Sequence, residues 1–244
     1  MKHVPRVFCE SALAAGSRQQ LPADTAHHLL HVLRLKPGAA LRIFDGRGGE
    51  YAAELVAAHR NHAEVLVGAH APLQRESPLQ LTLGQAISRA ERMDYSIQKA
   101  IELGVNAIQP LETERSLTGM AAQREQKKLR HWQQVACGAA EQCGRDRVPP
   151  VSTPMALEQW LAAISASSMK LLLDPQATQG LRDLERSTEI CLLSGPEGGL
   201  SPREIEQARS AGFIGVRLGS RVLRTETAAV AGIAALQTLW GDLG

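Results

Sequence analysis

LSGPEGGL at residues 193–200 and LGSRVLRTETA at residues 218–228 are the two stretches from which the expected fold follows, and we call them the first and second glycine turns. Each follows an apolar run typical of a buried strand and precedes a run typical of a helix. Ligands of α/β proteins bind beyond the carboxyl ends of parallel strands. The two turns are therefore expected to form two walls of one pocket.

The sequence from residue 79 onward alternates apolar strand-like runs with helix-like runs, which predicts a mainly parallel sheet covered by helices. Ser201 and Glu204 have the spacing of a capping box around Pro202, and Thr225 is expected to cap the last helix. The expected strands are residues 79–83, 107–111, 170–173, 190–193 and 213–218. The expected helices are residues 89–103, 121–142, 202–211 and 225–240.

Residues 1–72 contain short apolar runs separated by turns, which predicts a small β-barrel rather than an open sheet. Asp24 is expected to cap one helix in this region, over residues 25–35. Pro72 and Pro78 enclose a polar stretch that is typical of a linker, so we expect one domain at 1–72 and a second at 73–244. The expected strands of the first domain are residues 4–8, 40–44, 51–58 and 63–67.

The composition excludes several kinds of protein. With 44% hydrophobic residues among 244, the chain can bury a core, whereas 3% aromatic residues argue against a platform for stacking bases. The four cysteines form no C-x-x-C pair, so we expect no metal site and a reduced compartment. No apolar run approaches ~20 residues and no signal peptide is evident, which predicts a cytoplasmic protein without a membrane span.

The spacing of glycines in the first turn matches neither a dinucleotide fingerprint nor a phosphate-binding loop. Glu197 would repel a phosphate, which disfavours an enzyme that uses a phosphorylated nucleotide. A tight connection without any ligand would produce the same glycines. In the second turn, Arg224 either forms an ion pair with Glu226 or holds a substrate phosphate or base, and spacing alone leaves both open. Arg115 follows a predicted strand, so it ranks above residues on helix surfaces as a catalytic candidate.

The two glycine turns resemble those of the RsmE family, SPOUT-class methyltransferases of bacterial ribosomes. Leu200 and Val222 stand where that family usually has Phe and Ile, which are apolar exchanges. The resemblance extends in chain order over most of the sequence. It includes HVLRLKPG at residues 31–38, FDGRG at 44–48, QKAIELGV at 98–105, PLETERS at 110–116 and EQCGR at 141–145.

The resemblance implies a PUA-like RNA-binding β-barrel at 1–72 and, at 73–244, a SPOUT α/β domain with a C-terminal trefoil knot. It implies a homodimer that binds S-adenosylmethionine and methylates N3 of uridine 1498 in 16S ribosomal RNA of the small subunit. The cofactor-binding residues that it implies are Leu172, Leu173, Ser194, Gly195, Glu197, Gly199, Leu218, Gly219, Val222, Leu223, Thr225, Thr227 and Ala228.

Catalysis requires that the proton on N3 of uridine be removed or the resulting anion stabilised, because the protonated nitrogen is a poor nucleophile. Arg115 and Arg224 are the expected stabilising groups, and Glu197 is the expected proton acceptor or cofactor contact. The RNA-binding residues expected in the first domain are Arg6, His31, Arg34, Lys36 and Arg47. The alternative is a non-catalytic RNA-binding protein of ribosome assembly, whose α/β domain only dimerises.

Overall fold

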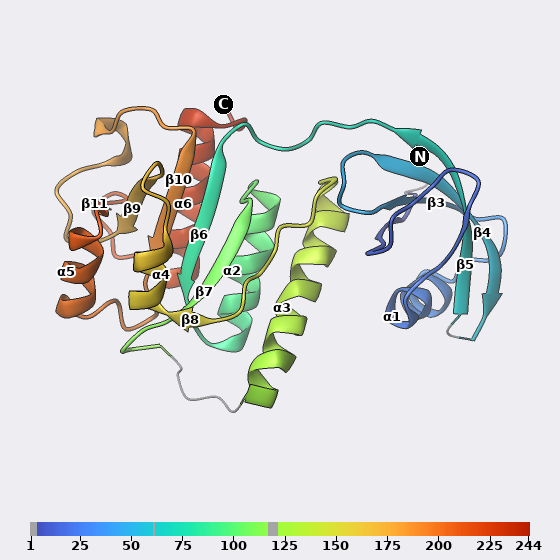
Figure 1. Ribbon diagram of the computed structural model, residues 1–244, viewed down its shortest axis with the longest axis horizontal. Helices are drawn as coiled ribbons and strands as arrows, with labels where there is room; N and C mark the ends of the chain where they lie inside the picture. The colour runs from blue at the N-terminus through green and yellow to red at the C-terminus, as the bar shows by residue number, and fades with distance from the viewer. Residues whose placement is uncertain (1–3, 61, 117–121) are drawn as a thin grey trace. The chain divides into compact units, whose positions relative to one another are not determined.

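The structure is a computed structural model of the chain, and it describes residues 4–60, 62–116 and 122–244 (Figure 1). The chain divides into two compact units. The first, which we call the N-terminal unit, combines Met1–Glu76 with Ala140–Val148. The second, the C-terminal unit, combines Ser77–Ala139 with Pro149–Gly244. The N-terminal unit is therefore discontinuous in sequence, because a segment from the middle of the chain belongs to it.

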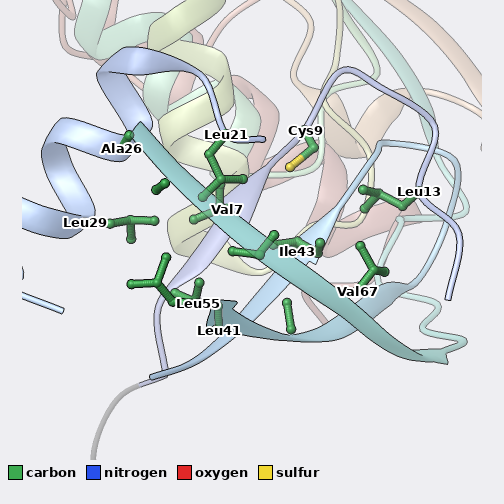
Figure 2. Close-up of a cluster of buried hydrophobic side chains, with 13 residues drawn as sticks. Val7, Cys9, Leu13, Leu21, Ala26, Leu29, Leu41, Ile43, Leu55 and Val67 are labelled. Carbon is green, nitrogen blue, oxygen red and sulfur yellow. The ribbon is translucent and has the colours of Figure 1, made fainter. Parts of the chain in front are cut away.

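A five-stranded sheet forms the N-terminal unit, and its outer strands β1 and β2 are not joined by a ladder in the described residues. β1 and β3 pair in parallel, whereas the other neighbours are antiparallel. Alternating side chains of the strands enclose an apolar core that includes Ile43, Leu55 and Val65, all fully buried (Figure 2). The strand order is β1 (Arg6–Phe8), β3 (Ala40–Phe44), β4 (Glu50–His59), β5 (His62–Ala71) and β2 (Arg18–Gln20).

The helix expected at residues 25–35 begins earlier and ends sooner. It consists of α1 (Ala23–His27) and a π-helical turn, η1 (His28–Val32). The prediction that Asp24 caps it is wrong, because Asp24 lies inside the first turn and Pro22 occupies the cap position without a side-chain hydrogen bond. An acidic residue in the first turn still favours the helix dipole. The helix ends before Arg34, whose φ of 54° is left-handed.

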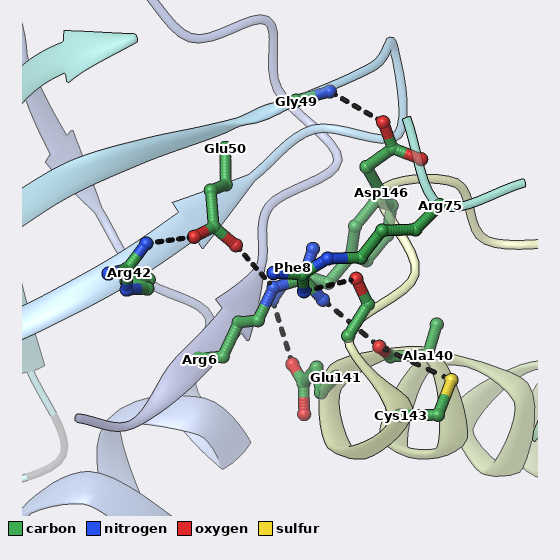
Figure 3. Close-up of polar contacts among 11 residues, drawn as sticks. Arg6, Phe8, Arg42, Gly49, Glu50, Arg75, Ala140, Glu141, Cys143 and Asp146 are labelled. Carbon is green, nitrogen blue, oxygen red and sulfur yellow. Dashed lines mark hydrogen bonds and ion pairs between the residues drawn. The ribbon is translucent and has the colours of Figure 1, made fainter. Parts of the chain in front are cut away.

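The segment Ala140–Val148 joins the N-terminal unit through polar contacts (Figure 3). The buried carboxylate of Asp146 accepts a hydrogen bond from the backbone N–H of Gly49 at 2.7 Å, and Glu141 accepts one from Phe8 at 2.8 Å. Arg75 donates to the carbonyl of Gly144 at 2.9 Å. These contacts satisfy backbone groups of strand β1, of the turn before β4 and of a helix end, which would otherwise be left without partners.

The six strands of the C-terminal unit all pair in parallel, which confirms the sheet predicted from the alternation. The glycine turns follow β10 and β11. In order, the strands are β11 (Ile214–Val216), β9 (Met169–Leu173), β10 (Glu189–Ser194), β6 (Gln80–Ala86), β7 (Ala107–Glu112) and β8 (Met155–Ala156). β8 and the short helix after it are not among the predicted elements.

Helices cover both faces of this sheet (Figure 1). Cys191 and Leu193 of β10 pack in the cluster formed with α4 and α5, whereas Leu192 lies against Gly232 of α6. Burial on both faces explains why the strands are continuous apolar runs. Gly84 in β6 leaves room for the ring of Trp160, since an added Cβ would lie 2.3 Å from it. The helices are α2 (Ala90–Glu102), α3 (Ala122–Cys143), α4 (Leu157–Ala163), α5 (Pro202–Ser210) and α6 (Thr225–Trp240).

The ends of α5 and α6 differ in how well the sequence predicts them. The capping box of α5 is confirmed, because Ser201 accepts from the N–H of Glu204 while the Glu204 carboxylate accepts from the N–H of Ser201. The prediction that Thr225 caps α6 is wrong, because the cap position is Arg224. The Thr225 hydroxyl instead donates a hydrogen bond to the carbonyl of Gly195. Of the helices in the described residues, none has the length and apolar character that a membrane crossing requires.

Candidate functional site

A cavity of about 590 Å³ lies at the carboxyl ends of β9, β10 and β11. Its walls are the loop after β9, which includes Asp174, and the two glycine turns; Arg92 and Arg115 also line it. This confirms that the two turns form walls of one pocket. The volume is in the range that accommodates small-molecule ligands and cofactors.

Most residues proposed from the sequence as cofactor contacts lie in the lining of this cavity, as do the three catalytic candidates Arg115, Glu197 and Arg224. Gly219 and Thr227 are the two candidates that do not line it. The sequence reasoning missed several lining residues. Asp174 and Pro175 had a signal, because they end a predicted strand at the same edge of the sheet. The missed residues are Arg92, Asp174, Pro175, Gln176, Pro196, Leu200, Ile205, Val216, Arg217 and Arg221.

The backbone of the first glycine turn is held by side chains from other elements. The Thr225 hydroxyl donates to the carbonyl of Gly195 at 2.6 Å and accepts from the Gln85 side chain at 3.1 Å. Both side chains are buried, so these hydrogen bonds form away from water. Arg115 donates to the carbonyl of Gly198 at 3.0 Å. The first turn is thus connected to β6, to the start of α6 and to the loop after β7.

Glu197 is fixed at the wall of the cavity from the side of α2. It accepts hydrogen bonds from the N–H of Arg89 at 3.1 Å and from the Arg92 guanidinium at 3.2 Å. Partial burial pushes the pKa of Glu197 upward, but these hydrogen bonds and the charge of Arg92 outweigh burial and hold the pKa below its usual value. Glu197 is therefore ionised at neutral pH.

Arg92 also lies 3.9 Å from the carboxylate of Glu226, at the start of α6. One guanidinium thereby connects a carboxylate of the first glycine turn with one of the second. Among the described residues, the ion pair of Glu226 is with Arg92 and none is formed with Arg224. The interpretation of Arg224 as an ion-pair partner of Glu226 is therefore wrong, and the guanidinium of Arg224 is left exposed at the cavity.

The glycines of the two turns are required for two different reasons. Gly199 and Gly219 have φ values of 68° and 76°, which side chains rarely adopt. Gly195 and Gly198 do not share this left-handed conformation; added Cβ atoms there would lie 3.3 Å from Leu200 and from Arg115. At Gly195 and Gly198 the constraint is therefore the space available to a side chain and not the backbone conformation.

The residues proposed to bind RNA lie in the N-terminal unit, and four of the five are exposed: His31, Arg34, Lys36 and Arg47. Arg6 differs, because its side chain is only 8% exposed and its guanidinium donates to Glu50 and to the carbonyl of Ala140 (Figure 3). It also lies 3.7 Å from the ring centre of Phe44. Arg6 thus makes its contacts inside the N-terminal unit, and we do not propose it as an RNA contact.

No group of His, Cys, Asp or Glu side chains suited to holding a metal ion occurs among the residues that the structure describes. Burial, together with the nearby carboxylates of Glu141 and Asp45, raises the pKa of the Cys9 thiol to about 12. Burial is also the main reason that the pKa of Cys191 is raised. Both thiols are protonated at neutral pH, which makes them poor nucleophiles.

Comparison with known proteins gives a consistent result for both parts of the chain. Residues 75–237 match the family model of an RNA methyltransferase domain, and residues 21–68 match that of an RNA methyltransferase PUA domain. The chain is 35% identical over 243 residues to ribosomal RNA small subunit methyltransferase E of Buchnera aphidicola from Schizaphis graminum, covering 99% of both chains.

Solved structures are similar over the same length. The ribosomal RNA small subunit methyltransferase E of Neisseria gonorrhoeae, bound to S-adenosyl methionine, has a TM-score of 0.92 and 40% identity, covering 99% of this chain and 100% of that one. A putative methyltransferase of Legionella pneumophila, in complex with the same cofactor, has a TM-score of 0.95 and 36% identity over the same shares.

Proposed function

This chain belongs to the family of ribosomal RNA small subunit methyltransferase E, and we propose that it transfers a methyl group from S-adenosylmethionine to N3 of uridine 1498 in 16S ribosomal RNA. The observation that carries this proposal is the cavity between the two glycine turns. It lies where α/β sheets bind ligands, and the described residues that line it offer backbone groups, apolar side chains and two carboxylates.

The cavity has the properties that S-adenosylmethionine requires. Leu172, Leu218 and Leu223 offer apolar surface for the adenosine, and the fixed first glycine turn offers backbone close to the ligand because Gly195 and Gly199 have no side chain. The ionised Glu197 suits a ligand that carries a positive charge. We propose the lining residues of the predicted set, with Asp174 and Gln176 added, as the cofactor contacts.

We propose a SPOUT-class trefoil knot for the C-terminal unit, which the path of the chain after β11 supports. β11 pairs with β9 at the edge of the sheet, but α6 begins two strands further in, where Thr225 contacts Gly195 and Gln85. The chain must therefore pass β9 and the loop that leaves it. The N–H of Arg217 also donates to the carbonyl of Gln179 in that loop, at 2.9 Å.

The chemistry divides between the cofactor and the side chains of the cavity. When bound, S-adenosylmethionine supplies an activated methyl group. The protein has to align N3 of the uridine with that group and stabilise the charge left when the N3 proton departs. Arg224 and Arg115 are the proposed stabilising groups, because both are exposed to the cavity. Arg224 is the stronger candidate, since Arg115 is already hydrogen-bonded to Gly198.

Glu197 is better suited to positioning than to accepting the N3 proton. Its pKa is held below the usual value and its carboxylate already accepts two hydrogen bonds. A carboxylate stabilised in this way is a weak base. We therefore propose that Glu197 orients the cofactor and that Arg92 orients Glu197. Proton transfer is then assisted mainly by lowering the energy of the uridine anion, which is the role of Arg224.

We propose that residues 1–72 form most of the RNA-binding domain and residues 73–244 most of the methyltransferase domain, although Ala140–Val148 belongs to the N-terminal unit. His31, Arg34 and Lys36 form an N-terminal surface that supports RNA binding, because all three side chains are exposed and of basic type. Arg34 adopts a left-handed backbone at the end of a helix, where glycine or asparagine is usual. A residue held in a strained backbone conformation at an exposed position is typical of a functional site. Arg47 lies in the β3–β4 turn, at the opposite end of β4 from Arg60, whose carbonyl contacts His31, so we propose it as a separate RNA contact.

We also propose that the protein is a cytoplasmic homodimer. Tyr95 of α2 and Leu239 of α6 are 46% and 37% exposed, although both are large and apolar. These helices pack together on one face of the sheet (Figure 1). Exposed apolar surface of this kind is typical of association between subunits. Light scattering during gel filtration measures the molar mass directly, and a monomer at micromolar concentration would contradict the dimer.

Two measurements test the proposed activity against a non-catalytic role in ribosome assembly. Calorimetry with S-adenosylhomocysteine should detect one site per chain, and binding should be lost when Gly199 is replaced by Val. Primer extension on small-subunit RNA from a strain that lacks the protein should show no stop at uridine 1498, and the purified enzyme should restore the stop. RNA binding without cofactor binding or methylation would favour the non-catalytic role.

A further inference from the structure

The arginines around the cofactor cavity exceed the carboxylates that are available to pair with them. Within the described residues, each carboxylate in the lining already has a cationic partner. Asp174 lies 3.4 Å from Arg209, and Glu197 lies 3.2 Å from Arg92. The arginines that remain in the lining are Arg115, Arg217, Arg221 and Arg224.

Three of these remaining arginines are clustered in the eight residues 217–224, and we call Arg217, Arg221 and Arg224 the arginine rim. All three side chains are exposed. In the described part of the chain their guanidinium groups make no ion pair and no hydrogen bond. By contrast, Arg92, Arg145 and Arg6 all form ion pairs with carboxylates. Several uncompensated cations beside a cavity produce a positive potential that favours an anionic ligand.

The cofactor accounts for little of this positive charge. S-adenosylmethionine has one carboxylate, and its sulfonium and amino groups are cations. A single carboxylate accepts a bidentate contact from one guanidinium. The remaining arginines thus need another anion at the same cavity, and the proposed substrate provides one. An RNA segment whose target nucleotide enters the cavity must carry a phosphate on each side of that nucleotide.

We propose that Arg217 and Arg221 bind the RNA phosphates that flank the methylated nucleotide, next to Arg224 at the reacting base. The inference rests on the proposed function and adds to it a second RNA contact, on the C-terminal unit. Arginine suits this task because its planar guanidinium makes bidentate contacts with phosphate. Val222, which is 80% exposed between the rim arginines, offers apolar contact to the extruded base or its neighbour.

The test compares Arg217→Gln, Arg221→Gln and the double variant with wild type. Arg186→Gln is the matched control, because Arg186 is an exposed arginine of the same unit that does not line the cavity. The equilibrium constant for binding of each protein to 16S ribosomal RNA is measured at several salt concentrations, with S-adenosylhomocysteine and without it. Thermal unfolding checks that the variants fold, which we expect because all three arginines are exposed.

Each single variant should reduce the magnitude of the slope of log K against log salt by about 0.7 to 0.9, and the double variant by about twice as much. Arg186→Gln should keep the wild-type slope. The affinity for S-adenosylhomocysteine should stay within twofold of wild type. A slope equal to that of the control overturns the inference, and so does a loss of cofactor affinity with an unchanged RNA slope, which would assign the rim to the cofactor carboxylate.

The two proposals fail separately. If wild type does not bind S-adenosylhomocysteine, the proposed methyl transfer is contradicted, and the salt slopes measured without that ligand still decide the role of the rim. If wild type binds the ligand and the slopes of Arg217→Gln and Arg221→Gln equal that of Arg186→Gln, the methyl transfer stands and the rim is not an RNA contact.

Discussion

The two glycine turns line the same cavity but differ in how their backbones are held. The first turn is contacted by Thr225, Arg115 and Arg92, and each contact is a hydrogen bond to a carbonyl or carboxylate of the turn. The second turn has exposed arginines whose guanidinium groups, within the described residues, hold nothing in the protein. The first turn is thus held by hydrogen bonds from side chains, whereas the exposed arginines of the second turn are available to a ligand.

The difference between the two turns suits a cavity that we propose to bind two ligands. A cofactor that must be held in one geometry gains from a wall that is already fixed, because little entropy is then lost on binding. An RNA substrate has to enter, react and leave, so its contacts have to be free before it arrives. We therefore expect substitutions in the first turn to reduce stability and cofactor affinity, and substitutions of the exposed arginines in the second turn to affect the substrate.

The largest effect should come from Arg224→Gln in the second turn. Because Arg224 is the proposed group that stabilises the uridine anion, kcat should fall about 100- to 1000-fold, as when one preorganised donor is removed from an anion site. Single-turnover methylation at saturating RNA measures this, and S-adenosylhomocysteine affinity is the control for an intact cavity. Turnover equal to that of wild type would remove Arg224 from the mechanism.

The apolar residues of the two turns provide a matched pair. Leu200 is 8% exposed and packs in the core cluster of α4 and α5, so Leu200→Ala should lower the free energy of unfolding by about 2 kcal/mol or more. Val222 is 80% exposed, and Val222→Ala should change it by less than about 0.5 kcal/mol. Urea unfolding measures both, and equal effects would contradict the contrast between the turns.

Thr225 connects the first turn to the sheet, and Thr225→Val removes its hydroxyl while keeping its shape. The carbonyl of Gly195 and the side chain of Gln85 then lose a partner in a buried site, which should cost about 1–3 kcal/mol of stability. Thr225→Ser keeps the hydroxyl and is the control. If the Val and Ser variants unfold at the same urea concentration, the hydroxyl does not hold the turn.

The smallest effect concerns the pH dependence of Glu197. Its pKa is lowered in the folded protein, so its contribution to stability is fully present above the ordinary value of 4.5 and is lost as the pH falls through the lowered value. The difference in stability between wild type and Glu197→Gln should be below about 1 kcal/mol at pH 7, because the pair with Arg92 is partly exposed. This difference should shrink in acid. A constant difference from pH 7 to pH 3 would show that the charge is not the cause.

Local patterns in the sequence predicted most elements of the C-terminal unit. The face of α2 formed by Met93, Ile97, Ala100 and Ile101 is fully buried, and Gly104 follows with a φ of 85°. Apolar periodicity and a terminating glycine are properties of a few adjacent residues, so the helix can be predicted without knowing the tertiary structure. The small strands β2 and β8 were missed because two or three residues carry too little periodicity.

The N-terminal unit shows where local patterns fail. Residues 140–148 belong to it by contacts such as that of Asp146 with Gly49, yet in sequence they continue a helix of the C-terminal unit. The roles of Asp24 and Arg6 were also mistaken, since an acidic residue near a helix start and an arginine near the N-terminus have ordinary roles that differ from the observed ones. In both cases the sequence shows the type of the residue but not the groups that it contacts.

The alternation of strands and helices, the positions of the two glycine turns and, through the ordered resemblance, the family could all be predicted from the sequence. Three features could not: the hydrogen bond of Thr225 to Gly195, the contacts of Arg92 with both Glu197 and Glu226, and the rim arginines without ion pairs in the described residues. They depend on residues that are far apart along the chain. Propensity and periodicity act over a few residues, whereas Gln85 and Thr225 are 140 residues apart and meet because the sheet places β6 beside β10.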